Sequence, residues 1–115
     1  MTTQNNWITV CSDADLVNNS GVCALVNKQQ IAIYKIKSGN DEQVFASSNW
    51  CPFGKANVLY RGLLGSVEDK KVIISPLYKQ RFCLETGACL DDEEVNLRVY
   101  PVRIEQNQVQ LQLAE

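Results

Sequence analysis

The chain has 115 residues, of which 45% are hydrophobic and 21% charged, and its 11 Lys and Arg against 13 Asp and Glu give a formal charge of −2. This balance excludes a general attraction to phosphate backbones or anionic lipid, so we expect neither nucleic acid nor a membrane as a partner. The chain contains no His, which removes imidazole ligands and the commonest general base. We therefore expect no catalysis by this chain alone, and a single domain over residues 1–115 with its core at about residues 7–113.

The first half of the chain reads as short strands joined by turns. Ser12 followed three residues later by Asp15 has the form of a capping box, which predicts one helical turn. Two apolar runs beyond it, separated by a polar segment, predict a hairpin. The expected elements are strands at 7–10, 22–26, 31–34 and 44–46, with turns at 27–30 and 37–41.

The clearest alternation comes last, where Val102 and Ile104 alternate with Arg103 and Glu105. Apolar residues 109, 111 and 113 then alternate with glutamines across a polar turn at 106–108, which predicts a half-buried hairpin. Many short strands with closely spaced turns indicate an all-β antiparallel sandwich or small barrel. Further strands are expected at 49–54, 71–75, 81–84 and 88–90, with a turn of helix at Leu16 or within 57–65.

The five cysteines are an odd number and form no C-x-x-C pair, which argues against a disulfide framework and a zinc site. We expect buried, structural free thiols, with Cys83 and Cys89 able to face one another across a hairpin. No stretch approaches the ~20 apolar residues of a membrane span. The N-terminal residues also lack a basic segment and an apolar run, so we expect a cytoplasmic protein.

Two segments, Cys51-Pro52-Phe53 and Ser75-Pro76-Leu77-Tyr78, have the spacing of the C-x-H and C-x-x-H loops that hold a Rieske iron–sulfur centre. In such a centre two Cys bind one iron and two His bind the other. A lone thiolate cannot hold a two-iron cluster, so we expect no metal and no cofactor on this chain. The two rings at the former imidazole positions are expected to pack into the vacated volume. The degenerate ligand positions are Cys51, Phe53, Ser75 and Tyr78.

From about Trp7 to Leu113 the chain resembles a Rieske-type domain, and the residues at 53 and 78 are similar to those of the small subunits of NAD(P)H-dependent assimilatory nitrite reductases. The resemblance implies an all-β, Rieske-like antiparallel β-sandwich with two cluster-type loops but no cluster. One departure is the 21 residues, 54–74, between Phe53 and Ser75, which fit an inserted loop or a separate β-sandwich family. The resemblance depends on the order and spacing of segments 21–25, 44–46, 61–63, 75–82 and 100–103.

What the resemblance implies about function is a non-catalytic small subunit paired with a large subunit. In that family the large subunit carries FAD, a [4Fe–4S] cluster and sirohaem, and it reduces nitrite to ammonia with NAD(P)H. None of these cofactors would bind to this chain.

The end of the domain that carries the two loops is a candidate docking surface for such a partner. In a Rieske domain this end approaches the redox partner, and here it carries an aromatic and several basic residues. The alternative interpretation is that these basic residues are ordinary solvated loop charges. A solvated loop is also the simplest interpretation of the acidic run 91–94. The candidate docking residues are Trp50, Lys55, Arg61 and Lys79.

Two other functions stay open from the sequence. One is a Rieske ferredoxin-like electron carrier that holds its cluster through other ligands, against which the absence of His argues. The other is a free-standing β-sandwich binding module, for which an apolar pocket near Phe53 and Tyr78 would be the place to look.

Overall fold

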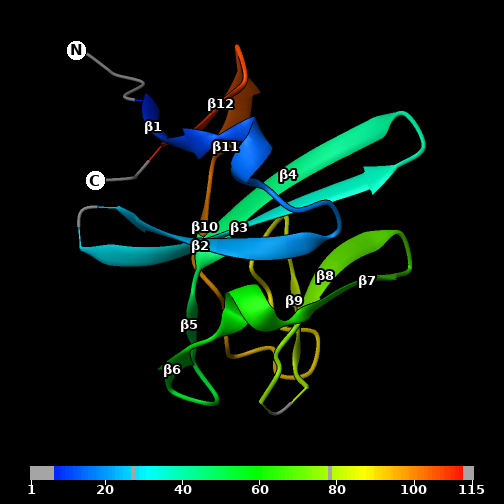
Figure 1. Cartoon of the computed structure of the whole chain (residues 1–115). Coiled ribbons are helices and arrows are strands. Elements are labelled where there is room, and N and C mark those ends of the chain that lie inside the picture. Colours follow the sequence, from blue (N-terminus) through cyan, green and yellow to red (C-terminus); the bar gives the residue numbers. More distant parts are fainter. Residues whose placement is uncertain (1–6, 27, 78, 113–115) are drawn as a thin grey trace, which may run out of the picture.

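The computed structural model describes residues 7–26, 28–77 and 79–112, and most of its regular structure is β-strand (Figure 1). Every pairing between named strands is antiparallel, which confirms the all-β antiparallel architecture expected from the sequence. The elements are β1 (Trp7–Ser12), η1 (Asp13–Asp15), β2 (Ser20–Val26), β3 (Gln29–Ser38), β4 (Asp41–Ser48), β5 (Trp50–Cys51), β6 (Ala56–Asn57), η2 (Leu59–Arg61), β7 (Leu63–Val67), β8 (Lys70–Ile74), β9 (Arg81–Cys83), β10 (Val99–Tyr100), β11 (Val102–Glu105) and β12 (Gln108–Gln112).

The middle of the molecule is a four-stranded sheet with the order β10-β4-β3-β2. Successive side chains of a strand point to opposite faces, so β3 contributes to a core on each side of this sheet. Ile31 and Ile33 belong to one apolar cluster, whereas Ala32 and Tyr34 belong to the other. All four are 0% exposed, which explains why this strand has an uninterrupted apolar run.

A second sheet, with the order β1-β12-β11, covers one face of the first. The chain passes between the two sheets at Pro101, because Val99 and Tyr100 pair with β4 while Val102 begins the pairing with β12. Proline has no N–H to donate, so it suits a point where a ladder ends. The hairpin expected near the C-terminus is confirmed up to Gln112, and residue 113 lies outside the described residues.

The other face of the central sheet is covered by the β7-β8-β9 sheet, the β5–β6 hairpin and η2. Figure 1 shows these elements, coloured green to yellow, on the opposite side of β2 and β3 from β11 and β12. Phe82 and Ile73 of this layer pack into the same cluster as Tyr34. The two cluster-type loops belong to this layer and therefore lie on the opposite side of the central sheet from β1 and β12.

The turn of helix expected within 57–65 is confirmed at Leu59–Arg61. The chain after it forms β7 (Leu63–Val67), which the sequence did not predict, because it can pair with β8 along five positions. The strand expected at 88–90 was wrong, since it is reduced to isolated bridges, Ala88 with Asn96 and Cys89 with Phe82.

The cysteines also depart from expectation. Cys51, Cys83 and Cys89 are buried free thiols, but Cys23, in the middle of the edge strand β2, is exposed. Cys89 is bridged to Phe82, and the Cys83 N–H donates to the Ala88 oxygen. Neighbouring positions of a ladder point to opposite faces, so Cys83 and Cys89 do not face one another.

Candidate functional site

The two cluster-type loops are versions of one turn. Loop 1 (residues 51–55) and loop 2 (residues 75–79) both have Pro in second place and Lys in fifth. The Lys55 N–H donates to the Cys51 oxygen at 2.7 Å, and the Lys79 N–H donates to the Ser75 oxygen at 3.1 Å. Both lysines have left-handed backbones, with φ of 55° and 65°. Each loop therefore returns its chain to the residue that occupies its first ligand position.

The first ligand positions of the two loops meet each other. The Cys51 Sγ and Ser75 Oγ atoms are hydrogen bonded at 3.2 Å, and both residues are 0% exposed. The Gly54 N–H donates to the Cys51 sulfur at 3.4 Å, and the Leu77 N–H donates to the Ser75 hydroxyl at 3.3 Å. The polar atoms are thus satisfied within the loops, as buried polar groups must be. A hydrogen bond between two side chains of this chain therefore joins the loops at the place where a Rieske domain holds its iron.

Apolar contacts hold the rest of the two loops together. The Phe53 ring packs on Phe82 with their centroids 6.1 Å apart and their planes tilted by 44°, a geometry typical of aromatic pairs. A Cβ added to Gly54 would clash with the Leu77 Cδ1 atom, so a larger residue there would require the Leu77 side chain to shift. Phe53 packs as expected, but Tyr78 lies outside the described residues, and its packing stays a prediction.

These residues do not fit a Rieske cluster. Such a cluster needs two thiolates and two imidazoles, whereas the four positions offer one thiol, a hydrocarbon ring, a hydroxyl and a phenol. Over the described ranges, no group of three or more His, Cys, Asp or Glu side chains could hold a metal ion. The arrangement around Cys51 and Ser75 provides packing and hydrogen bonding, with no donor set for iron.

Asn49 is a residue at this site that the sequence did not single out. It is 0% exposed, and its Nδ2 donates to the Asn57 oxygen at 3.0 Å and to the Gln30 Oε1 at 3.2 Å. Its Oδ1 accepts from the Tyr60 N–H at 2.8 Å. One amide therefore ties β3, β6 and η2 together immediately before loop 1. Nothing in its sequence surroundings marks it, because the partners come from three different segments.

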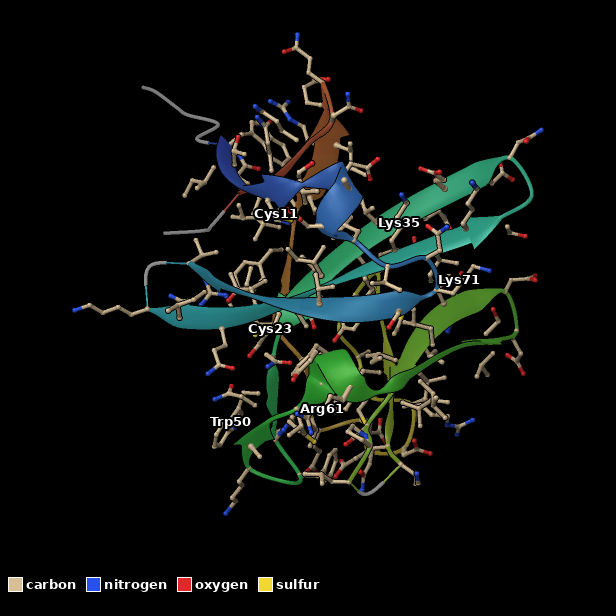
Figure 2. The ribbon with its side chains drawn as sticks, viewed as in Figure 1. Cys11, Cys23, Lys35, Trp50, Arg61 and Lys71 are labelled. Carbon is tan, nitrogen blue, oxygen red and sulfur yellow. The ribbon has the colours of Figure 1, made fainter. Side chains whose placement is uncertain are left out.

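The four candidate docking residues are all exposed and all belong to the two loops or their neighbours. Trp50 is 45% exposed, and Figure 2 shows it at the margin of the half of the molecule that also carries Arg61. The Arg61 guanidinium lies 5.5 Å from the centroid of the Tyr60 ring. Lys55 and Lys79 occupy equivalent places in the two loops. Their role in docking stays a prediction.

The acidic run 91–94 is exposed, as expected, yet one of its members is held in place. The Arg81 Nη2 lies 2.9 Å from the Asp91 Oδ1, and the Arg81 backbone N–H donates to the Asp91 Oδ2 at 2.8 Å. These hydrogen bonds lower the pKa of Asp91. The pair fastens the loop to the start of β9.

Within the described part of the chain, no helix is both long and apolar enough to cross a membrane.

Comparison with known proteins identifies the class to which this fold and these loops belong. The family model for the Rieske-like [2Fe-2S] domain matches residues 6–112, and the chain therefore belongs to that family. The nitrite reductase (NADH) small subunit of Salmonella typhimurium is 39% identical over 107 residues, which cover 93% of this chain and 97% of that protein. Within the Rieske-like family, the chain belongs to the small subunits of NAD(P)H-dependent nitrite reductase.

Two further relatives bear on the architecture. A solution structure of the nitrite reductase [NAD(P)H] small subunit from Erwinia carotovora superimposes with a TM-score of 0.78 at 42% identity, covering 95% of this chain and 82% of that one. The nitrite reductase [NAD(P)H] large subunit of Klebsiella oxytoca is 37% identical over 103 residues, which are 90% of this chain but 10% of that protein. A related domain is therefore part of a much longer chain in Klebsiella.

Proposed function

We propose that this chain is a cluster-free, non-catalytic small subunit that associates with a large subunit to reduce nitrite to ammonia with NAD(P)H. The observation that carries the proposal is the Klebsiella large subunit, which contains a domain related to this chain within a single polypeptide. A domain that is separate in one protein and covalently joined in a relative is expected to lie against the same partner in both. The single domain over residues 1–115 and the cytoplasmic location are parts of this proposal.

In this proposal the redox chemistry lies wholly on the partner, which would carry FAD, a [4Fe–4S] cluster and sirohaem. The four degenerate positions in loops 1 and 2 lack the donors for a two-iron cluster, so no electron is routed through this chain. The ferredoxin-like alternative requires such a route, and the Cys51–Ser75 hydrogen bond already uses the one thiol at those positions. The chain would act by binding and stabilising the large subunit.

One docking surface in this proposal is the loop end of the domain. Trp50 is the candidate anchor, because it is exposed and tryptophan is enriched among the residues that contribute most to binding energy. Lys55, Arg61 and Lys79 would surround it with positive charge, which favours an acidic patch on the partner.

The test is co-expression of the full chain with its large subunit, followed by size-exclusion chromatography and measurement of the dissociation constant. We expect a stable complex, and Trp50→Ala should weaken it by more than ~1 kcal/mol. Leu63→Ala is the matched control, because Leu63 is 65% exposed but lies on the β7–β8 hairpin. Replacement of Glu93 in the acidic loop by Gln should also have little effect. Failure of the two wild-type proteins to associate would contradict the proposed function.

A further inference from the structure

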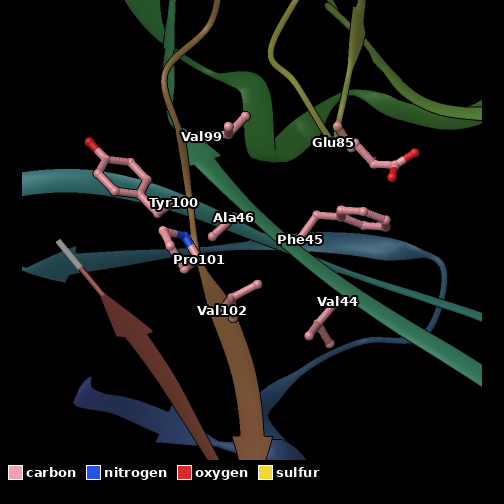
Figure 3. A pocket seen from close by; sticks show the side chains of 9 residues that line it. Val44, Phe45, Ala46, Glu85, Val99, Tyr100, Pro101 and Val102 are labelled. Atoms are coloured by element: carbon pink, nitrogen blue, oxygen red, sulfur yellow. The ribbon is translucent and has the colours of Figure 1, made fainter. Parts of the chain in front are cut away.

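A groove of about 500 Å³ opens where β4 and β11 diverge, on a different part of the molecule from loops 1 and 2. Figure 3 shows its side chains converging from β4, from the β10–β11 crossing and from the turn that follows β9. Most of these side chains are apolar, and one carboxylate lies among them. The lining of the groove includes Val44, Phe45, Leu84, Glu85 and Val102.

The floor of the groove is an open strand edge. β10 covers β4 only opposite Ala46 and Ser47, and among the described residues no strand pairs with that edge further toward Asp41. The Ser48 N–H donates to the Arg98 oxygen on this side. Along an antiparallel strand, the backbone groups of every second residue point to the same side. Val44 and Glu42 are an even number of residues from Ser48, so their N–H and C=O groups point to this open side, away from β3.

The opposite wall of the groove, formed by β11, is also an open strand edge. β11 is the edge strand of its sheet, with β12 on one side and no strand on the other among the described residues. The Gln112 N–H donates to the Pro101 oxygen, so the backbone groups of Val102 and Ile104 are directed away from β12. The groove thus lies between two strand edges that have unused hydrogen-bonding groups, an arrangement that accepts an additional strand.

The side chains around this edge define what an added strand must carry. Val44 points to one face of the sheet, toward Val102, and makes an apolar subsite there. Phe45 points to the other face, where Leu84 and Glu85 line the groove. The Glu85 carboxylate is exposed and has no ion pair among the described residues. By contrast, the Glu42 carboxylate already lies 3.8 and 3.9 Å from the Lys35 and Lys37 amines.

We infer that the groove binds an extended segment of the large subunit, which adds to the open edge of β4 as a further strand. The segment would place an aliphatic side chain between Val44 and Val102. Its next residue, which points to the opposite face, would be Lys or Arg, with its stem over Phe45 and its charge at Glu85. The identity of this partner rests on the proposed function, whereas the site itself depends only on the β4 edge and Glu85.

A second copy of this chain is a poorer occupant. β4 has the sequence DEQVFASS, which contains no Lys or Arg. Antiparallel pairing of two β4 edges would therefore bring more acidic side chains toward Glu85 without supplying a cation. Like charges in such positions oppose pairing.

The test uses the full chain and the intact large subunit. Hydrogen exchange at the Glu42 and Val44 amides should slow when the complex forms, because these amides would become donors to the added strand. Glu85→Lys should raise the dissociation constant about tenfold. Glu68→Lys, an identical charge change in the β7–β8 turn, should alter it less than about twofold. Val44→Pro, which removes an outward N–H and leaves the β3 ladder intact, should also weaken binding.

The outcomes separate this inference from the proposed function. A complex that forms without protection at Glu42 and Val44, and that tolerates Glu85→Lys, would overturn the strand-addition site and leave the subunit assignment standing. Absence of any complex would overturn both. If the two amides become protected in the isolated chain as its concentration rises, the occupant is a second copy, and the assignment to the large subunit is wrong.

Discussion

Replacing Phe53 by Ala tests whether packing has taken the place of metal in the two loops. Truncating a fully buried Phe costs about 3–5 kcal/mol, but Phe53 keeps part of its surface in solvent. Its main partner, Phe82, is 0% exposed, and the ring pair contributes about 0.5–1.5 kcal/mol beyond area burial. We therefore expect the free energy of unfolding to fall by about 2 kcal/mol in Phe53→Ala.

Urea unfolding followed by tryptophan fluorescence measures this loss, and thermal unfolding should show a midpoint lowered by about 8 °C. The control is Leu25→Ala, because Leu25 is 73% exposed and should change the stability by less than about 0.5 kcal/mol. Equal stability of Phe53→Ala and wild type would refute the argument that this ring fills the ligand position. The corresponding effect of Tyr78→Ala stays a prediction from the sequence alone.

Three further predictions concern other parts of the fold. Ser75→Ala should cost about 1–3 kcal/mol in urea unfolding, because it removes the hydrogen bond to the buried Cys51 thiol and the acceptor of a backbone N–H; an unchanged midpoint would contradict this. A thiol reagent should modify Cys23 first among the five cysteines, because Cys23 is exposed. The part of its thiol that is shielded from water still raises its pKa. The pH at which its rate reaches half of the maximum should therefore lie above 9.0, and a midpoint at or below 9.0 would contradict the raised pKa. Gly87→Ala should unfold the protein far more readily than Gly39→Ala, because both have positive φ but only the Cβ at Gly87 would meet backbone, 1.9 Å from the Leu97 oxygen.

The strands with strong local patterns could be predicted from the sequence. The alternation in 102–112 and the apolar run 31–34 gave hairpins in the right places, and the capping box is present, with the Ser12 N–H donating to the Asp15 Oδ2 at 2.9 Å. β7 could not be predicted from a local pattern. Gly65 and Ser66 interrupt its pattern, and its stability comes from pairing with β8, whose residues lie later in the chain.

The positions of the two loops could be predicted from the sequence, but the contacts that they make could not. The spacing of Cys51, Phe53 and Ser75 located both loops and indicated the missing ligands. The approach of Gly54 to Leu77, however, depends on how two separate segments meet. The contacts of Asn49 depend on backbone and side-chain groups from three elements, none adjacent in sequence. Long-range contacts of this kind leave no periodicity in a single sequence.

Reconstitution of the purified chain with iron and sulfide under reducing conditions tests whether the ligand positions pack and form hydrogen bonds without iron. Bound iron and the electron paramagnetic resonance of the reduced protein are then measured. We expect no retained iron and no signal of a reduced [2Fe–2S] centre, because the two loops offer one thiol and no imidazole. Two irons for each chain, with the signal of a reduced Rieske centre, would contradict it.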